Sequence, residues 1–433
     1  MDEDKNMDYN LDMEIEKPFT PKWPKTARIS LIISICSSIV LIVAVIILAV
    51  LYSKELSNNS SKESSSNSPS TMPEINLFSI FGQKIPNLPY DENGKIINSF
   101  KRDGGENYNE AMGEINNGQD YEKNERNIYD LYIPQYALDR INETNGIVLW
   151  IHGGGWVNGD KSGMDIFCQM NALPGYIAAT MSYTLLDKKY SNFNIFRILD
   201  EITACIKAIK KYLLDKGFLE NKLRLVIGGY SAGGHLVLLY SHLIKNFPIP
   251  MAFVVNYVGP IGLEKKYFYK VKLLNDTLEN IEDVTTINKA VEEGRLIPAF
   301  EDEIKLTFMN LFYGNKFNEH EIKEMLYPNG TLNETNEKYQ EMFNVVKFAY
   351  IPEINDYHSD VPIICIYGGI DETVGVSAFA YLNEKAKISG RELKLIYSRK
   401  EGHMLINPQT PDGIKKLWET NSIITKYLKS KIG

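Results

Sequence analysis

The feature that most constrains the fold is a regular alternation of short β-rich runs with longer amphipathic stretches. The β-rich runs occupy residues 128–133, 146–151, 175–183, 223–228, 253–258, 361–367 and 393–397. Apolar residues at three- and four-residue spacings fill residues 198–214, 232–244, 376–388 and 414–428. Strands that alternate with helices are typical of a parallel sheet with helices on its faces. The sequence therefore predicts an α/β fold with a mostly parallel, doubly wound sheet.

One segment, residues 262–351, breaks this alternation. It carries charged helical stretches at residues 302–312 and 319–325, and it is too long for a plain connection between two elements. We therefore expect an inserted helical cap. The sequence has no Gly-rich phosphate motif and no His, Cys and acid cluster at metal-ligand spacing, so it predicts neither a cofactor nor a metal.

The composition is that of a globular protein with a large core. Of 433 residues, 44% are hydrophobic, and 47 basic against 55 acidic residues give a formal net charge of −8. Nucleic-acid surfaces are basic, so this balance argues against a nucleic-acid partner. One large domain with smaller attachments fits the length.

Residues 29–52 form an uncharged, strongly apolar run. At about 1.5 Å per residue it is long enough to cross a roughly 30 Å hydrocarbon core, which predicts a transmembrane signal-anchor helix. A buried core helix and a cleaved signal peptide are the alternatives. Lys17, Lys22, Lys25 and Arg28 precede the run without an intervening acid, which predicts a cytosolic N-terminus and a lumenal or extracellular remainder.

The predicted organisation follows from this anchor. Residues 1–28 are a cytosolic tail, residues 53–73 a Ser/Asn-rich stalk too polar to bury a core, and residues 74–433 the folded domain. Candidate glycosylation sequons begin at Asn58, Asn59, Asn142, Asn275, Asn329 and Asn333. Cys36 lies in the apolar run, so Cys168, Cys205 and Cys365 allow at most one internal disulfide and require none.

The sharpest motif is Gly-Tyr-Ser-Ala-Gly at residues 229–233, directly after one β-rich run and directly before a helical pattern. This context is typical of a nucleophile elbow, in which a tight strand-to-helix turn presents Ser231 at the edge of the sheet. The alternative is an ordinary turn in which Ser231 caps the helix.

A second glycine motif, His-Gly-Gly-Gly-Trp at residues 152–156, follows the β-rich run 146–151. Backbone N–H groups of Gly153, Gly154 and Gly155, with that of Ala232, could bind the oxyanion of an acyl-transfer intermediate, although not all four can act at once. The alternative is a flexible glycine turn.

A nucleophile of this kind needs a base and an acid later in the chain. Of six histidines, only His403 follows the last β-rich run, and Asp371 follows the run 361–367. Glu372 is the alternative acid. These positions predict a Ser231, His403 and Asp371 triad.

With these motifs, residues 127–433 resemble an α/β-hydrolase of the esterase/lipase branch that carries a His-Gly-Gly-Gly motif. The run 229–235 and Trp156 are most similar to bacterial ferulic-acid-esterase-like hydrolases, isoprenylcysteine methylesterases and kynurenine formamidases. The hormone-sensitive-lipase group, which includes the membrane-anchored arylacetamide deacetylase, usually has Asp before the serine and an Asp-Pro-Leu acid motif. Tyr230 and residues 371–374 depart from that pattern. The resemblance implies a nucleophile at Ser231, an acid at Asp371, a base at His403 and oxyanion donors in the two glycine motifs.

The motifs together predict a serine hydrolase that cleaves small-molecule carboxylic esters through an acyl-enzyme. The charged insertion favours a closed pocket and short acyl groups, and the resemblance implies short-acyl or aryl esters. A serine peptidase of the prolyl-oligopeptidase type would need a β-propeller for which the chain before residue 146 is too short. A non-catalytic adhesion or receptor ectodomain on the same scaffold is the other alternative. The sequence predicts no oligomeric state.

Overall fold

The computed structural model describes residues 83–89, 126–187, 193–244, 246–262, 268–273, 278–350, 360–375, 377–405 and 411–432. All of these lie in the second of two units into which the chain divides, Asn76–Gly433. The predicted tail, membrane anchor and stalk lie outside the described residues. Within the described part of the chain, no helix is both long enough and apolar enough to cross a bilayer.

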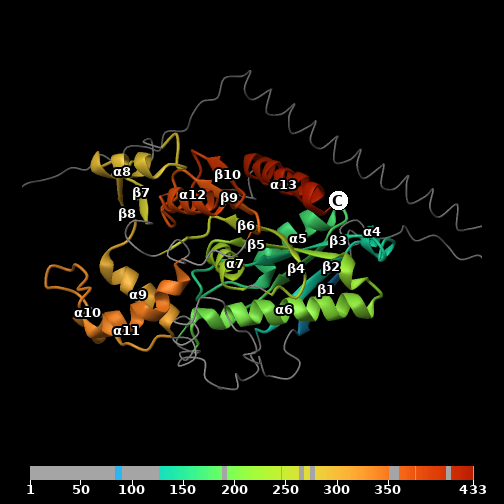
Figure 1. The fold of residues 1–433 in the computed structure, drawn as a ribbon, viewed down its shortest axis with the longest axis horizontal. Coiled ribbons are helices and arrows are strands. Elements are labelled where there is room, and N and C mark those ends of the chain that lie inside the picture. Colours follow the sequence, from blue (N-terminus) through green and yellow to red (C-terminus); the bar gives the residue numbers. More distant parts are fainter. Residues whose placement is uncertain are drawn as a thin grey trace, which may run out of the picture. The chain divides into compact units, whose positions relative to one another are not determined.

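The described residues form an α/β fold around an eight-stranded sheet (Figure 1). Its strands are β1 (Gln83–Pro89), β2 (Ile128–Ile133), β3 (Asn145–Ile151), β4 (Ile177–Met181), β5 (Leu223–Tyr230), β6 (Met251–Tyr257), β9 (Ile363–Gly368) and β10 (Leu393–Ser398). They lie in the order β1-β2-β4-β3-β5-β6-β9-β10. β2 is antiparallel to β1 and β4, and the other neighbouring pairs are parallel. The predicted mostly parallel sheet is therefore confirmed.

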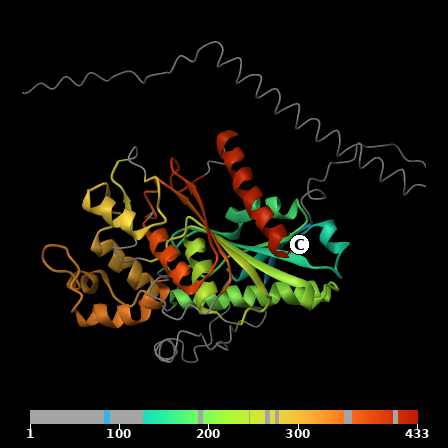
Figure 2. The same cartoon turned by 45° about the horizontal axis from the view of Figure 1, so that its top comes forward.

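Helices cover both faces of the sheet, as the alternation of strands and helices predicts. They are α4 (Gln135–Leu138), α5 (Asp165–Ala172), α6 (Ile195–Asp215), α7 (Ala232–Leu243), α12 (Ala378–Ser389) and α13 (Pro411–Ile432). Figures 1 and 2 both show α6 along one side of the sheet and α13 on the other.

Side chains of the central strands alternate between the two faces, because successive residues of a strand point to opposite sides. In β3, Ile147, Leu149 and Ile151 join the core beneath α6 and α7. Val148 and Trp150 join the second core, which contains buried residues of α5 and α13. Burial on both faces explains why these strands are apolar along their whole length.

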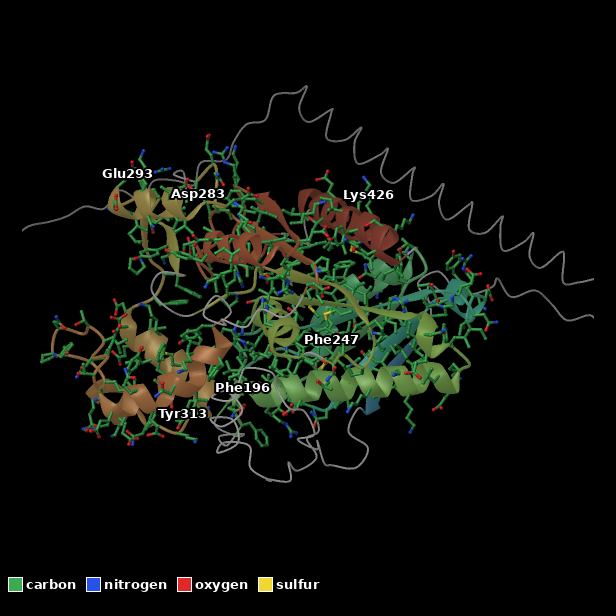
Figure 3. All side chains as sticks on the ribbon, in the orientation of Figure 1. Phe196, Phe247, Asp283, Glu293, Tyr313 and Lys426 are labelled. Carbon is green, nitrogen blue, oxygen red and sulfur yellow. The ribbon has the colours of Figure 1, made fainter. Side chains whose placement is uncertain are left out.

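The insertion predicted at residues 262–351 has two described parts. One is the two-stranded antiparallel sheet of β7 (Tyr269–Val271) and β8 (Leu296–Pro298), with α8 (Val284–Glu292) between these strands in the chain. The other contains α9 (Asp302–Tyr313), α10 (Glu319–Glu324) and α11 (Glu337–Val346). α9 packs against α6, and Figure 3 labels Tyr313 on α9 and Phe196 at the beginning of α6.

The three cysteines of the described part are free thiols. Cys168, Cys205 and Cys365 are all fully buried and unpaired. Burial raises the pKa of Cys365 to about 12, so its thiol stays protonated at neutral pH. The fold therefore depends on no disulfide among these three residues.

Candidate active site

Ser231 lies at the sharp turn between β5 and α7. Its backbone has φ 53° and ψ −119°, a conformation that non-glycine residues rarely adopt. Its N–H donates to the carbonyl of Tyr257 at 2.8 Å, which fixes the turn to β6. A Cβ on Gly229 would lie 2.1 Å from the carbonyl oxygen of Gly233, so the turn closes only with glycine there. Strain of this kind is typical of functional sites.

A chain of hydrogen bonds runs from Ser231 to the loop after β9. His403 Nε2 lies 2.9 Å from Ser231 Oγ, and His403 Nδ1 lies 2.8 Å from Asp371 Oδ2. Because a carboxylate accepts, Nδ1 carries the proton and donates to Asp371. Nε2 is then free to accept the hydroxyl proton of Ser231. The three side chains selected from the sequence therefore meet in one hydrogen-bonded series.

Two backbone hydrogen bonds fix the carboxylate of Asp371. It is 1% exposed, and its Oδ1 accepts from the N–H groups of Thr373 and Val374, each at 2.8 Å. These two bonds fix one carboxylate oxygen and turn the other toward His403. The alternative acid, Glu372, is exposed to solvent instead.

The glycine loop after β3 approaches the elbow closely. A Cβ on Gly153 would lie 2.9 Å from the carbonyl oxygen of Tyr230. Gly154 has φ +112°, and a Cβ there would lie 2.1 Å from the carbonyl oxygen of Asn158. The carbonyl of Gly154 accepts from the N–H of Asn158 at 2.9 Å, which closes a tight turn. The next residue, Gly155, lines the same pocket as Ser231.

A pocket of about 90 Å³ opens at this point. Gly155, Ser231 and Ala232 all line it. Ala232 is the first residue of α7, so its N–H has no partner within the helix. Of the four oxyanion donors considered from the sequence, Gly155 and Ala232 thus share a cavity with Ser231.

Aromatic side chains from the insertion form part of the pocket wall. Phe268, Phe300 and Phe308 line it beside Trp156. Ring centroids are 5.2 Å apart for Phe268 and Phe300, 5.7 Å for Phe300 and Phe308, and 5.8 Å for Phe308 and Trp156. Sequence analysis did not identify the three phenylalanines. No periodic pattern in the sequence marks them, because their place in the wall depends on how the insertion folds.

The other histidines among the described residues take no part in this hydrogen-bonded series. Burial lowers the pKa of both His152 and His235 to about 4, so both are neutral at pH 7. His235 Nε2 donates to the carbonyl of Ala349 at 2.8 Å and its ring stacks on Phe312. His320 is exposed on α10, and His358 lies outside the described residues.

No group of three or more His, Cys, Asp or Glu side chains in the described part of the chain is arranged to hold a metal ion. The arrangement can instead support nucleophilic attack by a serine hydroxyl, with a base at 2.9 Å and backbone N–H groups nearby.

The chain is similar to one family model and to several solved structures. The family model BD-FAE matches residues 129–278, which include both glycine motifs. A search of curated proteins finds no match.

Among solved structures, esterase B of Lactobacillus Rhamnosis (HN001) is 16% identical, with a TM-score of 0.45 over 72% of this chain and 84% of that one. A truncated carbohydrate esterase from gut microbiota is 12% identical, with a TM-score of 0.48 over 79% and 96%. A thermophilic esterase from the Planctomycetes species Thermogutta terrifontis is 16% identical, with a TM-score of 0.43 over 70% and 89%.

Proposed function

We propose that this chain, a carboxylic ester hydrolase by its BD-FAE match, cleaves esters through an acyl-enzyme formed on Ser231. Ser231 is the nucleophile, His403 the general base and then acid, and Asp371 the residue that orients the imidazole. The observation that carries the proposal is the hydrogen-bonded series from Ser231 through His403 to Asp371.

The reaction begins when Ser231 Oγ attacks the ester carbonyl and passes its proton to His403 Nε2. The carbonyl oxygen becomes an oxyanion, which the N–H groups of Gly155 and Ala232 stabilise. Collapse breaks the bond to the alcohol, which leaves with the proton from His403. A water molecule, deprotonated by His403, then attacks the acyl-enzyme and releases the carboxylic acid and Ser231.

The lining of the pocket indicates which half of the ester enters it. The pocket brings together Ser231 and the two N–H donors, which must surround the acyl carbon. His403 is not among the described residues that line the pocket, although it must reach the departing oxygen. We infer that the acyl group enters the pocket and the alcohol lies on the side of His403, beside Met404, which is 63% exposed.

This placement of the acyl group and the alcohol favours esters of a short acyl group and a larger alcohol. Sites for drug-sized ligands measure about 300 to 1,000 Å³, whereas this pocket has about 90 Å³. A fatty acyl chain exceeds that space, and the open side places no comparable limit on the alcohol. Short-acyl esters, including those of aryl alcohols, are the proposed substrates.

The proposal is tested on the full-length chain with a panel of p-nitrophenyl esters and an active-site fluorophosphonate. Wild type is expected to react with the probe and to prefer two- to four-carbon acyl groups. Ser231→Ala is expected to lose labelling and turnover while its circular dichroism is unchanged, because Ala fits the same backbone. Undiminished labelling of Ser231→Ala contradicts the assigned nucleophile. A folded wild type that neither labels nor hydrolyses any ester favours the non-catalytic ectodomain.

We also propose that residues 29–52 anchor the chain in a membrane, with the N-terminus in the cytosol and the hydrolase domain outside it or in a lumen. The exposure of Asn142 and Asn329, which begin two sequons, is compatible with a glycosylated domain. Protease added to sealed vesicles should remove only the N-terminal tail if the domain faces the lumen. Digestion of the domain in intact vesicles would indicate the opposite orientation.

A further inference from the structure

Tyr230 connects the nucleophile elbow to the backbone of the proposed base. It stands between Gly229 and Ser231, and its hydroxyl donates to the backbone carbonyl of His403 at 3.0 Å. The same oxygen lies 3.3 Å from Met404 Sδ. The phenol ring lies 5.8 Å, centroid to centroid, from the His403 imidazole. One side chain of the elbow thus contacts the base residue through both its backbone and its ring.

Two described backbone hydrogen bonds of the His403 loop lie at neighbouring residues. The N–H of Ile370 donates to the carbonyl of Glu401 at 3.0 Å, and the N–H of Leu405 donates to Gly402 at 3.0 Å. These bonds hold the chain two residues before His403 and at the turn around it. At His403 itself, the backbone anchor described by the structure is the bond from Tyr230.

The hydroxyl of Tyr230 remains a hydrogen-bond donor at neutral pH. Burial raises the pKa of Tyr230 above its usual value, and the nearby carboxylate of Asp371 raises it further. The hydroxyl therefore keeps its proton throughout the neutral range, and the bond to His403 does not titrate there.

We propose that Tyr230 is a positioning residue for the esterase reaction: by holding the carbonyl of His403, it fixes the imidazole relative to Ser231, which the same elbow carries. The inference rests on the proposed function. It assigns a role to the side chain of Tyr230, which occupies one of the two variable positions of the Gly-x-Ser-x-Gly motif. Asp371 orients the imidazole ring of His403, and Tyr230 fixes the position of the His403 backbone relative to Ser231.

Tyr230→Phe removes one oxygen and keeps the ring. The net value of a single hydrogen bond predicts a fall in kcat of about threefold to tenfold. KM for short-acyl esters should be unchanged, because Tyr230 is not among the described residues that line the pocket. The fall should be larger for acetates of aliphatic alcohols than for p-nitrophenyl acetate, because an alkoxide needs the proton from His403 and p-nitrophenolate does not.

Tyr427→Phe is the matched control. Its hydroxyl donates to Glu392 on the surface. The variant therefore loses the same kind of hydroxyl oxygen outside the site, and its kcat should equal that of wild type. A second comparison introduces Tyr230→Phe into a His403→Ala background. If Tyr230 acts through His403, it should not change the residual activity there.

The experiment measures kcat, KM and the rate of fluorophosphonate labelling for these full-length variants, with melting temperatures recorded alongside. A lower kcat at unchanged KM, a slower labelling rate and no effect in the His403→Ala background support the proposal. Equal kcat in wild type and Tyr230→Phe overturns it, as does an equal loss in both backgrounds, which would indicate a merely structural role. If wild type itself is neither labelled nor active, the proposed function fails first.

Discussion

Gly233 packs directly against the carbonyl of Ile151, so closely that a Cβ on Gly233 would lie 2.1 Å from that oxygen. Gly233 belongs to the first turn of α7, and Ile151 ends β3, the strand that leads into the glycine loop. β3 and β5 are paired parallel strands, so both carboxyl ends lie at one edge of the sheet. This contact joins the serine elbow to the loop that carries the proposed oxyanion donors.

The geometry of the glycine loop can be tested at Gly154. Gly154→Ala places a Cβ against the carbonyl of Asn158 at a positive φ, so the loop must shift and move Gly155. We expect kcat to fall about 100-fold, the usual cost of losing one oxyanion donor. Gly163→Ala is the control, because a Cβ there meets nothing within 4 Å. Equal activity of the two variants would remove Gly155 from the mechanism.

The triad can be tested by combining substitutions. Asp371→Asn and His403→Ala should each lower kcat by about 10³- to 10⁴-fold, because each disrupts proton transfer from Ser231. Adding either to Ser231→Ala should cost little more, since the three groups act as one unit. Esterase turnover measured for the singles and doubles decides this, and additive losses would assign the residues separate roles.

The acyl pocket can be enlarged at Phe308, which lies in its wall on α9. Phe308→Ala should shift the preferred acyl length upward, with kcat/KM for six- to eight-carbon esters rising about tenfold relative to acetate. Phe343→Ala is the control, because this half-buried phenylalanine of α11 is not among the described pocket residues. An unchanged chain-length profile in Phe308→Ala would place the acyl group outside the pocket.

Stability should depend on pH through the buried histidines. His152 and His235 have pKa values of about 4 in the folded state, against about 6.5 in an unfolded chain. Between these values the unfolded state binds protons that the folded state does not, so the melting temperature should fall as the pH is lowered from 6.5 to 4. His235→Gln should flatten this dependence, whereas His320→Gln, at an exposed position, should not. Equal slopes in all three proteins would contradict the role of burial.

Much of the sheet could be predicted because buried parallel strands leave a continuous apolar run. β2 spans the residues expected, and β3, β5, β6, β9 and β10 differ at their ends by a few residues. β4 is shorter than expected, since Gly175 has φ +103° and belongs to the preceding turn. α5 was not predicted, because its eight residues are too few for a clear periodicity and no side chain caps its start.

The positions of Ser231, Asp371 and His403 could be selected because each follows a strand of the sheet, and the carboxyl ends of parallel strands meet at one edge. The roles of Thr373 and Val374 could not, since their contribution is a backbone N–H that any residue would supply. Nor could the wall formed by Phe300 and Phe308, because it depends on how the insertion folds back over the site. Long-range packing of this kind leaves no periodic pattern in the sequence.

The backbone hydrogen bonds that Asp371 accepts have a consequence for how the pocket can evolve. Thr373 and Val374 hold the carboxylate through their N–H groups, and the same two residues line the pocket. A substitution here that removes an N–H, as proline does, or that moves the backbone would therefore lower turnover as well as change the pocket. Phe300 and Phe308 belong to the insertion and hold none of the three triad side chains, so variation there is free of that penalty. Selection for new esters should accumulate changes in the insertion while the loop after β9 stays constant.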